Sequence, residues 1–133
     1  MDAPGLLKFI KNSKSFDRVL EKIKILTIGE GKCVAELKVD ESHTNPMGGL
    51  HGGLSATLVD CISTYALMSK MPTANVSVDI HLSYLKGAKV NDDIIIDASV
   101  IKTGKTLAFL EVDIKNKATG DVLVKGSHTK FLL

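Results

Sequence analysis

Asp60 is the residue of this sequence best suited to do chemistry. It lies within Leu58-Val59-Asp60-Cys61-Ile62, where the apolar residues have helical spacing, and no basic residue stands four positions away to pair with the carboxylate. Such a carboxylate can act as a general base on water. The competing interpretation is an ordinary acid on the solvent face of a helix, and this feature alone does not decide between the two. Small residues share the predicted helix face of Asp60 and leave space for a ligand: Gly53, Ala56 and Ser63.

The segment His51-Gly52-Gly53 stands directly before the predicted helix. Backbone N–H groups in the first turn of a helix lack intrahelical partners, so together with the helix dipole they can polarise a carbonyl oxygen. Gly52 lets a substrate approach closely, and Asn45 in the preceding loop could hold a carbonyl or a water. Taken without Asp60, the glycines indicate only a tight turn, and Asn45 before Pro46 is typical of a turn former.

Other catalytic and metal-binding patterns are missing from the sequence. No Gly-x-Ser-x-Gly elbow exposes a nucleophilic serine, and no Walker or dinucleotide glycine motif occurs. Ser77 faces away from Val76 and Val78 if its strand alternates regularly, which by itself predicts a solvent-facing serine. We expect no metal site, because no recognised ligand spacing links the cysteines and acids to the four histidines His43, His51, His81 and His128.

Lysines gather at two predicted strand ends. Lys86 and Lys89 follow Tyr84, and Lys102 and Lys105 flank the Gly104 turn. These positions suit the phosphate groups of a ligand. The alternative is that they are solvated lysines that protect edge strands and loops, which is a common arrangement.

Length and composition predict one globular domain over residues 1–133. The chain has 133 residues, of which 44% are hydrophobic and 24% charged, enough apolar surface to form a core. The formal charge of +2, from 17 Lys and Arg against 15 Asp and Glu, lacks the basic excess of a nucleic-acid binder. We expect Cys33 and Cys61 to be reduced and buried, since they form neither a CxxC motif nor two pairs.

The sequence also predicts where the protein resides. No apolar run approaches the roughly 20 residues of a membrane-spanning helix, and the acidic Asp2 near the amino terminus argues against a secretory signal. We therefore expect a cytoplasmic protein. Association with mitochondria stays open, although Asp17 and Glu21 make the amino-terminal segment a poor mitochondrial presequence.

The order of predicted elements defines the fold class. One or two short amphipathic helices precede Lys22, two strands of a hairpin surround Gly29-Glu30-Gly31, and a shaped loop runs from Ser42 to Gly53. A long helix and four further strands follow, at residues 54–70, 76–84, 94–101, 106–114 and 122–132. The period-two pattern of residues 76–84 predicts a half-buried strand. We expect an α+β hotdog fold, an antiparallel sheet wrapped around one long helix, whose edge strands favour pairing of two copies.

Four motifs resemble those of one enzyme family, the hotdog thioesterases related to phenylacetyl-CoA thioesterase. The likeness extends in order and spacing from about Phe16 to Lys130. It is carried by His43-Thr44-Asn45-Pro46-Met47-Gly48-Gly49-Leu50-His51-Gly52-Gly53-Leu54 with Asp60 following, and by Val76-Ser77-Val78-Asp79, Gly104-Lys105-Thr106-Leu107-Ala108-Phe109 and Asn116-Lys117-Ala118-Thr119-Gly120.

The resemblance implies hydrolysis of medium- to long-chain fatty acyl-CoA, without metal or cofactor, by a homotetramer built from two hotdog dimers. Asp60 would be the base on the attacking water, which Ser77 would help to place. The Gly52 N–H and Asn45 would serve the thioester carbonyl or the water, and His51 would hold the loop. The implied coenzyme A contacts are Tyr84, Leu85, Lys86, Gly87, Ala88, Lys89, Lys102, Thr103, Gly104, Lys105, Thr106 and Leu107.

Two other functions remain open from the sequence. A hotdog hydratase or dehydratase would use the same ligand with an acid and a nearby histidine, for which His51 is the candidate. A non-catalytic acyl-CoA-binding module would bind the ligand and release no thiol.

The spacing of Gly52 and Asp60 bears on how a site would be assembled. At 1.5 Å per residue the two positions are roughly 12 Å apart along one helix. A carbonyl held by an N–H and attacked by a base-bound water needs a shorter span. We therefore expect Gly52 and Asn45 of one subunit to work with Asp60 of the other.

Overall fold

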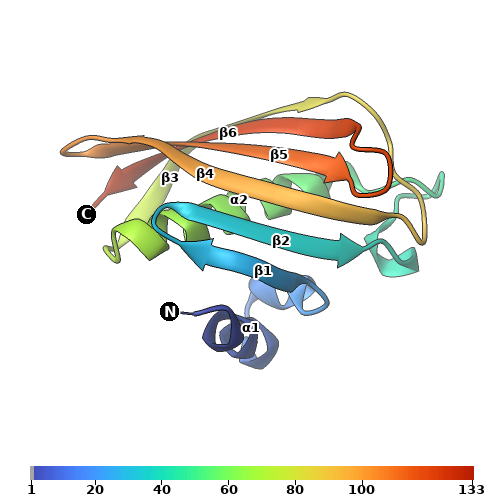
Figure 1. The fold of residues 1–133 in the computed structure, drawn as a ribbon, viewed down its shortest axis with the longest axis horizontal. Coiled ribbons are helices and arrows are strands. Elements are labelled where there is room, and N and C mark those ends of the chain that lie inside the picture. Colours follow the sequence, from blue (N-terminus) through green and yellow to red (C-terminus); the bar gives the residue numbers. More distant parts are fainter. Residues whose placement is uncertain (1) are drawn as a thin grey trace.

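The computed structural model describes residues 2–133 as a single antiparallel sheet with one long helix against it (Figure 1). The six strands follow the order β1-β2-β4-β5-β6-β3. The helical elements are α1 (Ala3–Asn12), the 3-10 turns η1 (Phe16–Leu20) and η2 (Glu41–His43), and α2 (Gly52–Lys70). The strands are β1 (Lys24–Gly29), β2 (Lys32–Lys38), β3 (Asn75–Tyr84), β4 (Asp93–Thr103), β5 (Leu107–Asn116) and β6 (Val122–Leu132).

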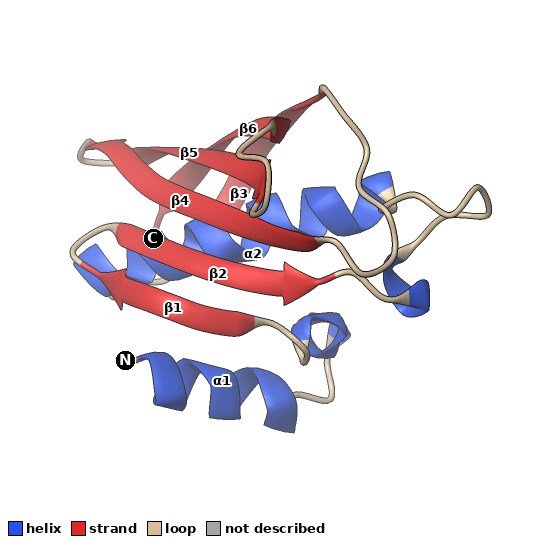
Figure 2. Ribbon diagram, turned by 45° about the vertical axis from the view of Figure 1, so that its right-hand side comes forward, coloured by secondary structure: helices blue, strands red, loops and turns tan. Residues whose placement is uncertain are grey.

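The sheet curves around α2, which confirms the predicted hotdog fold (Figure 2). The predicted apolar stripe of α2 is buried, with Leu58 and Ile62 fully inaccessible and Tyr65 9% exposed. Against it pack the apolar side chains of the central strands, including Ile94 and Ile96 of β4. The main departure in α2 is its start, two residues earlier than predicted, because His51 caps the glycines.

The amino-terminal segment forms the expected amphipathic helix. Asp2 caps α1 by accepting a hydrogen bond from the Gly5 N–H at 2.9 Å. Leu6 and Ile10 are buried in the main core, where α1 lies beside β1 (Figure 2). Of the described helices, none combines the length and the apolar character that crossing a membrane requires.

The prediction of a half-buried strand at residues 76–84 is wrong for the single chain. In β3 every residue except Asn75 and Leu82 is exposed, and Val76 and Val78 keep more than half of their surface open. The reason is position, because β3 is the edge strand next to β6, and α2 covers it less than it covers the central strands. The apolar pattern of β3 is therefore unpartnered within one protomer.

A β-bulge also breaks the expected alternation of β3. Ile80 pairs with His128 and Ser77 pairs with Lys130, while Val78 between them has no partner in the register. Directly paired residues of antiparallel strands point to the same face, and an extra residue switches the faces that follow it. Ser77 thus faces α2 with His128 and is not an outward-facing serine.

Candidate functional site

The first turn of α2 presents an unpaired backbone N–H. His51 is the N-cap, and its Nδ1 accepts a hydrogen bond from the Gly53 N–H at 2.8 Å. The Gly52 N–H has no acceptor among residues 2–133, while the Gly52 carbonyl accepts from the Tyr84 hydroxyl at 2.8 Å. A Cβ at position 52 would lie 3.3 Å from that hydroxyl, so the exposed Tyr84 ring would have to shift slightly to admit a side chain there. This end of the helix can donate one hydrogen bond to a ligand oxygen.

Asn45 lies in a tight turn beside the helix start. Its backbone N–H donates to Gly49 O at 2.8 Å, and its carbonyl accepts from the Gly48 N–H at 2.9 Å. The side-chain Oδ1 accepts from the Met47 and Gly49 N–H groups at 3.0 and 3.2 Å. This fixes the orientation of the amide and leaves Nδ2 without an acceptor among the described residues. Asn45 is therefore both a turn former and a free side-chain donor.

Asp60 lies beside a buried histidine that sequence analysis did not connect with it. The Asp60 side chain is 45% exposed, and its Oδ1 is 3.9 Å from His128 Nε2. His128 on β6 is only 1% exposed, and its two ring nitrogens lie 2.8 Å from Ser63 Oγ and from Ser77 Oγ. One imidazole thus links α2 to β3 next to the carboxylate.

The hydrogen-bond partners of Ser63 determine the tautomer of His128. The Ser63 hydroxyl lies 2.6 Å from Val59 O and 3.1 Å from Asp60 O, and both of these carbonyls can only accept. Its proton is used there, so Ser63 Oγ accepts from the His128 Nδ1–H. Nε2 then carries the lone pair and accepts from the Ser77 hydroxyl. The lone pairs of Ser77 Oγ remain available to a water.

The charge state of His128 agrees with this network. Burial, and secondarily the positive charge of Lys130, lower its pKa to about 4, although Asp60 and Asp79 act in the opposite direction. The ring is therefore neutral near pH 7. A neutral ring can hold Ser77 in place but is a weak base compared with a histidine in water.

Lys130 is a second buried base on the helix side of β6. It is 5% exposed, and its Nζ donates to Thr64 Oγ1 at 3.0 Å, one helical turn beyond Asp60. Burial lowers the pKa of Lys130, and the nearby Asp60 carboxylate opposes this shift. The negative charge of Asp60 thus favours the ammonium form of Lys130 from a distance, without a direct ion pair among the described residues.

Three features of this cluster differ from the sequence analysis. Ser63 is fully buried against His128 and does not leave space for a ligand beside Asp60. His128 and Lys130 were missed because they belong to a strand 68 and 70 positions after Asp60, and only the packing of β6 against α2 brings them close. His128 and Lys130 alternate with the apolar Leu132 along β6, and this alternation was the signal that could have placed both side chains on the buried face of the strand.

The cysteines are free and buried, as predicted. Burial raises the pKa of both thiols, Cys33 and Cys61, to about 12. Both are therefore protonated and inert near neutral pH. Among the described residues, no three of His, Cys, Asp and Glu gather where they could hold a metal ion.

The two predicted coenzyme A segments lie at opposite ends of the sheet. The segment from Tyr84 to Lys89 leads into β4, and Lys102 to Leu107 forms the turn at the other end of the same strand (Figure 1). A strand of 11 residues spans about 35 Å. Within one protomer, therefore, the two segments cannot contact the same phosphate groups.

The first coenzyme A segment lies against the Asn45 turn. Leu50 N–H donates to Ala88 O at 2.8 Å, and Gly49 forms a bridge with Lys89. Lys86 is already paired with Asp121 at 2.7 Å. Lys102 and Lys105 are exposed and have no ion-pair partner among residues 2–133, so their charges are available to an anion.

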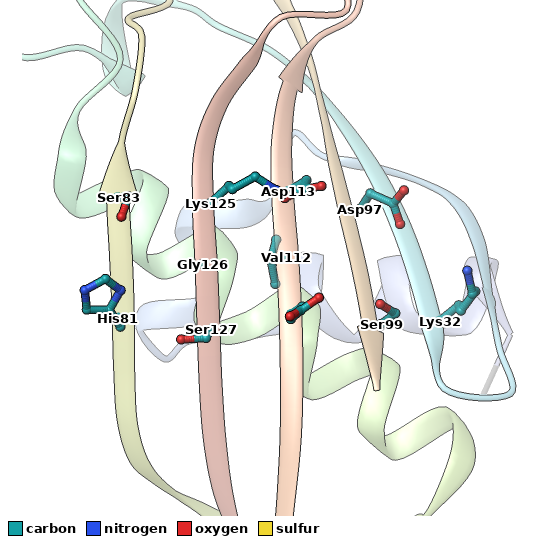
Figure 3. A pocket seen from close by; sticks show the side chains of 11 residues that line it. Lys32, His81, Ser83, Asp97, Ser99, Val112, Asp113, Lys125, Gly126 and Ser127 are labelled. Atoms are coloured by element: carbon teal, nitrogen blue, oxygen red, sulfur yellow. Dashed lines mark hydrogen bonds and ion pairs between the residues drawn. The ribbon is translucent and has the colours of Figure 1, made fainter. Parts of the chain in front are cut away.

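A polar hollow of about 330 Å³ lies on the outer face of the sheet, away from α2 (Figure 3). Lys125 Nζ bonds Asp113 Oδ1 there at 3.1 Å, and Asp97 stands directly opposite Asp113 on the neighbouring strand. None of the predicted site residues lines this hollow. The hollow is separate from Asp60, His128 and Ser77, which lie on the side of the sheet that α2 covers.

The chain is similar to known thioesterases in both sequence and structure. The Thioesterase superfamily matches residues 47–123, more than half of the chain. Human acyl-coenzyme A thioesterase 13 is 49% identical over 128 residues, which cover 96% of this chain and 91% of that protein. The crystal structure of zebra fish thioesterase superfamily member 2 has a TM-score of 0.94 at 48% identity, covering 97% and 94% of the two chains. A hypothetical thioesterase from Streptococcus pneumoniae, solved with coenzyme A, has a TM-score of 0.81 at 31% identity, covering 85% and 87%.

Proposed function

Because the chain belongs to the thioesterase superfamily and is a thioester hydrolase, we propose that it hydrolyses medium- to long-chain fatty acyl-CoA with Asp60 as general base. The observation that carries the proposal is the half-exposed Asp60 carboxylate beside the Ser77–His128 pair. The names of the human relative and of the coenzyme A-bound bacterial structure support the substrate class.

The proposed mechanism is direct attack by water. The water donates one hydrogen bond to Asp60 and one to Ser77 Oγ, which turns an oxygen lone pair toward the thioester carbon. Asp60 takes the proton as the C–O bond forms. The Gly52 N–H and the Asn45 Nδ2 stabilise the negative charge on the carbonyl oxygen. The tetrahedral intermediate then breaks its C–S bond, the departing coenzyme A thiolate takes the proton from Asp60, and the fatty acid is left with the Asp60 carboxylate restored.

The site is proposed to be shared between two subunits paired along β3. Val76, Val78 and Ile80 give this edge strand an exposed apolar surface, and an edge strand has unpaired backbone groups for a partner. A two-fold axis beside β3 brings opposite ends of two sheets together. The same operation would bring the Lys102–Leu107 turn of one subunit near the Lys86 segment of the other, and Asp60 near the partner's helix start. Two such dimers would form the expected tetramer.

The test is turnover of a chain-length series of acyl-CoA thioesters, followed by release of free thiol. Asp60→Asn, which is nearly isosteric, should lower kcat by about 10²–10⁴-fold with unchanged folding. Glu30→Gln, at an exposed acid in the turn between β1 and β2, is the matched control and should keep wild-type turnover. An Asp60→Asn variant that kept more than half of the wild-type turnover would remove Asp60 from the role of base.

A second candidate function is hydration of enoyl-CoA, which needs a histidine near the carboxylate. His128 Nε2, 3.9 Å from Asp60, is closer to this requirement than the predicted His51, which caps α2. Loss of enoyl-CoA absorbance without thiol release would favour the hydratase. Thiol release from saturated acyl-CoA favours the thioesterase.

A further inference from the structure

An open groove runs from the start of α2 toward η1. Its volume is about 600 Å³, within the range of roughly 300–1,000 Å³ typical of small-molecule sites. His51 and Gly53 form the end nearest the unpaired Gly52 N–H, and Leu54 and Thr57 continue the wall along α2. The groove is thus continuous with the proposed thioester site.

The far wall of the groove is apolar. Phe16 and Val19 of η1 are 68% and 39% exposed, and both side chains line the groove opposite the partly buried Leu54. Large apolar side chains that gather at a concave surface mark a binding site for apolar groups. Most of the other lining residues are polar, and one of them, Lys22, forms an ion pair with Asp40 at 2.6 Å.

We propose that this groove binds the acyl chain of the substrate and that Phe16 and Val19 set the preferred chain length. The proposal rests on the proposed function, since it starts the chain at a thioester held by Gly52. A carbonyl held at Gly52 lies at one end of the groove, and within one protomer the groove offers its alkyl group the apolar contacts of Phe16, Val19 and Leu54.

A second subunit is the competing occupant of the groove, and the topology argues against it. Pairing along β3 uses one edge of the sheet, whereas η1 leads into β1 at the opposite edge. The unpartnered apolar residues of β3 are therefore a separate surface from Phe16 and Val19.

The experiment compares the wild type with the double variant Phe16→Ala/Val19→Ala. Binding is measured by calorimetry with non-hydrolysable alkyl-CoA thioethers of 2, 6 and 12 carbons, and turnover with the matching thioesters. For the wild type, Kd should fall by up to about fourfold for each methylene buried. In the variant, Kd for the 12-carbon ligand should rise by about tenfold or more, while the two-carbon ligand changes by less than twofold.

Phe9→Ala is the matched control. Phe9 is 57% exposed on α1 and lies outside the groove, so its loss should leave the dependence on chain length unchanged. The size of the particle is measured by light scattering for every variant.

Several outcomes would overturn the groove as the acyl site. An equal change in Kd for all three chain lengths, with thiol release intact, would refute the groove and spare the thioesterase function. A smaller particle in the double variant would show that Phe16 and Val19 hold a second subunit instead. Absence of thiol release from every thioester offered to the wild type would refute the groove and the thioesterase function together.

Discussion

Ser77 Oγ lies 2.8 Å from His128 Nε2 because a β-bulge at Val78 turns the serine toward α2. Without the extra residue, Val78 would face the helix and Ser77 the solvent. The imidazole in turn receives its orientation from Ser63 on α2. A local irregularity of an edge strand thus positions the hydroxyl that lies nearest the water of the proposed mechanism.

The first prediction concerns this hydroxyl. Ser77→Ala should lower kcat roughly tenfold, the cost of losing one hydrogen bond to the attacking water, with little change in KM. Ser83→Ala is a matched control on the same strand, since Ser83 lines the outer hollow and does not face α2. Steady-state thiol release measures both variants.

The same variant tests a different mechanism, in which Ser77 is a nucleophile and His128 its base. In that case Ser77→Ala would be as inactive as Asp60→Asn. An acyl-enzyme would also appear by mass spectrometry during turnover of the wild type. Either observation would contradict direct attack by water.

The second prediction is a loss of stability in acid that originates at His128. The pKa of the buried ring is about 4, against 6.5 as the ordinary value. Below pH 6.5 the unfolded chain therefore binds a proton that the folded chain does not, and the free energy of unfolding falls until about pH 4. The loss is on the order of 3 kcal/mol at most. Urea unfolding between pH 7.5 and 4 measures it.

His128→Gln supplies the comparison, because glutamine can still bond Ser63 and Ser77 but does not titrate. Its unfolding free energy should depend less on pH between 6.5 and 4 than that of the wild type. Burial also lowers the pKa of His43, so a residual slope with pH is expected from that residue. Identical slopes in the variant and the wild type would show that His128 is not held neutral in the fold.

The sequence predicted the fold well because its main signals are local. The apolar stripe of α2 and the glycine turns depend on residues within a few positions of one another, and each element was found near its predicted place. The environment of Asp60 could not be derived in the same way. His128 and Lys130 reach it only through the packing of β6 against α2. The bulge at Val78 reverses the face that regular alternation predicts for Ser77.

The third prediction concerns the turn between β4 and β5. Lys102→Ala combined with Lys105→Ala should raise KM for acyl-CoA several-fold and leave kcat nearly unchanged, because a phosphate contact far from the carbonyl contributes uniform binding. Added salt should weaken wild-type binding in the same way. Lys8→Ala with Lys11→Ala removes the same charge from α1 and should have no such effect. An unchanged KM at low ionic strength would exclude the phosphate contact.

The fourth prediction tests whether two chains build each site. Asp60 and Gly52 are roughly 12 Å apart along α2, and the two lysine segments occupy opposite ends of one sheet. Asp60→Asn and Asn45→Ala protomers should each be inactive alone, because a homodimer of either lacks one group in both sites. In a mixed dimer, one site combines the intact Asn45 of the Asp60→Asn protomer with the intact Asp60 of the Asn45→Ala protomer.

Equal amounts of the two variants are unfolded together and refolded, so that half of the dimers are mixed. Each mixed dimer holds one intact site of two, and roughly a quarter of the wild-type activity should return. Subunit exchange is verified by native mass spectrometry with one variant isotope-labelled. If exchange is complete and the mixture stays as inactive as its parents, then Asn45 and Asp60 of each site belong to the same chain. The proposal of a site shared between two subunits would then be wrong.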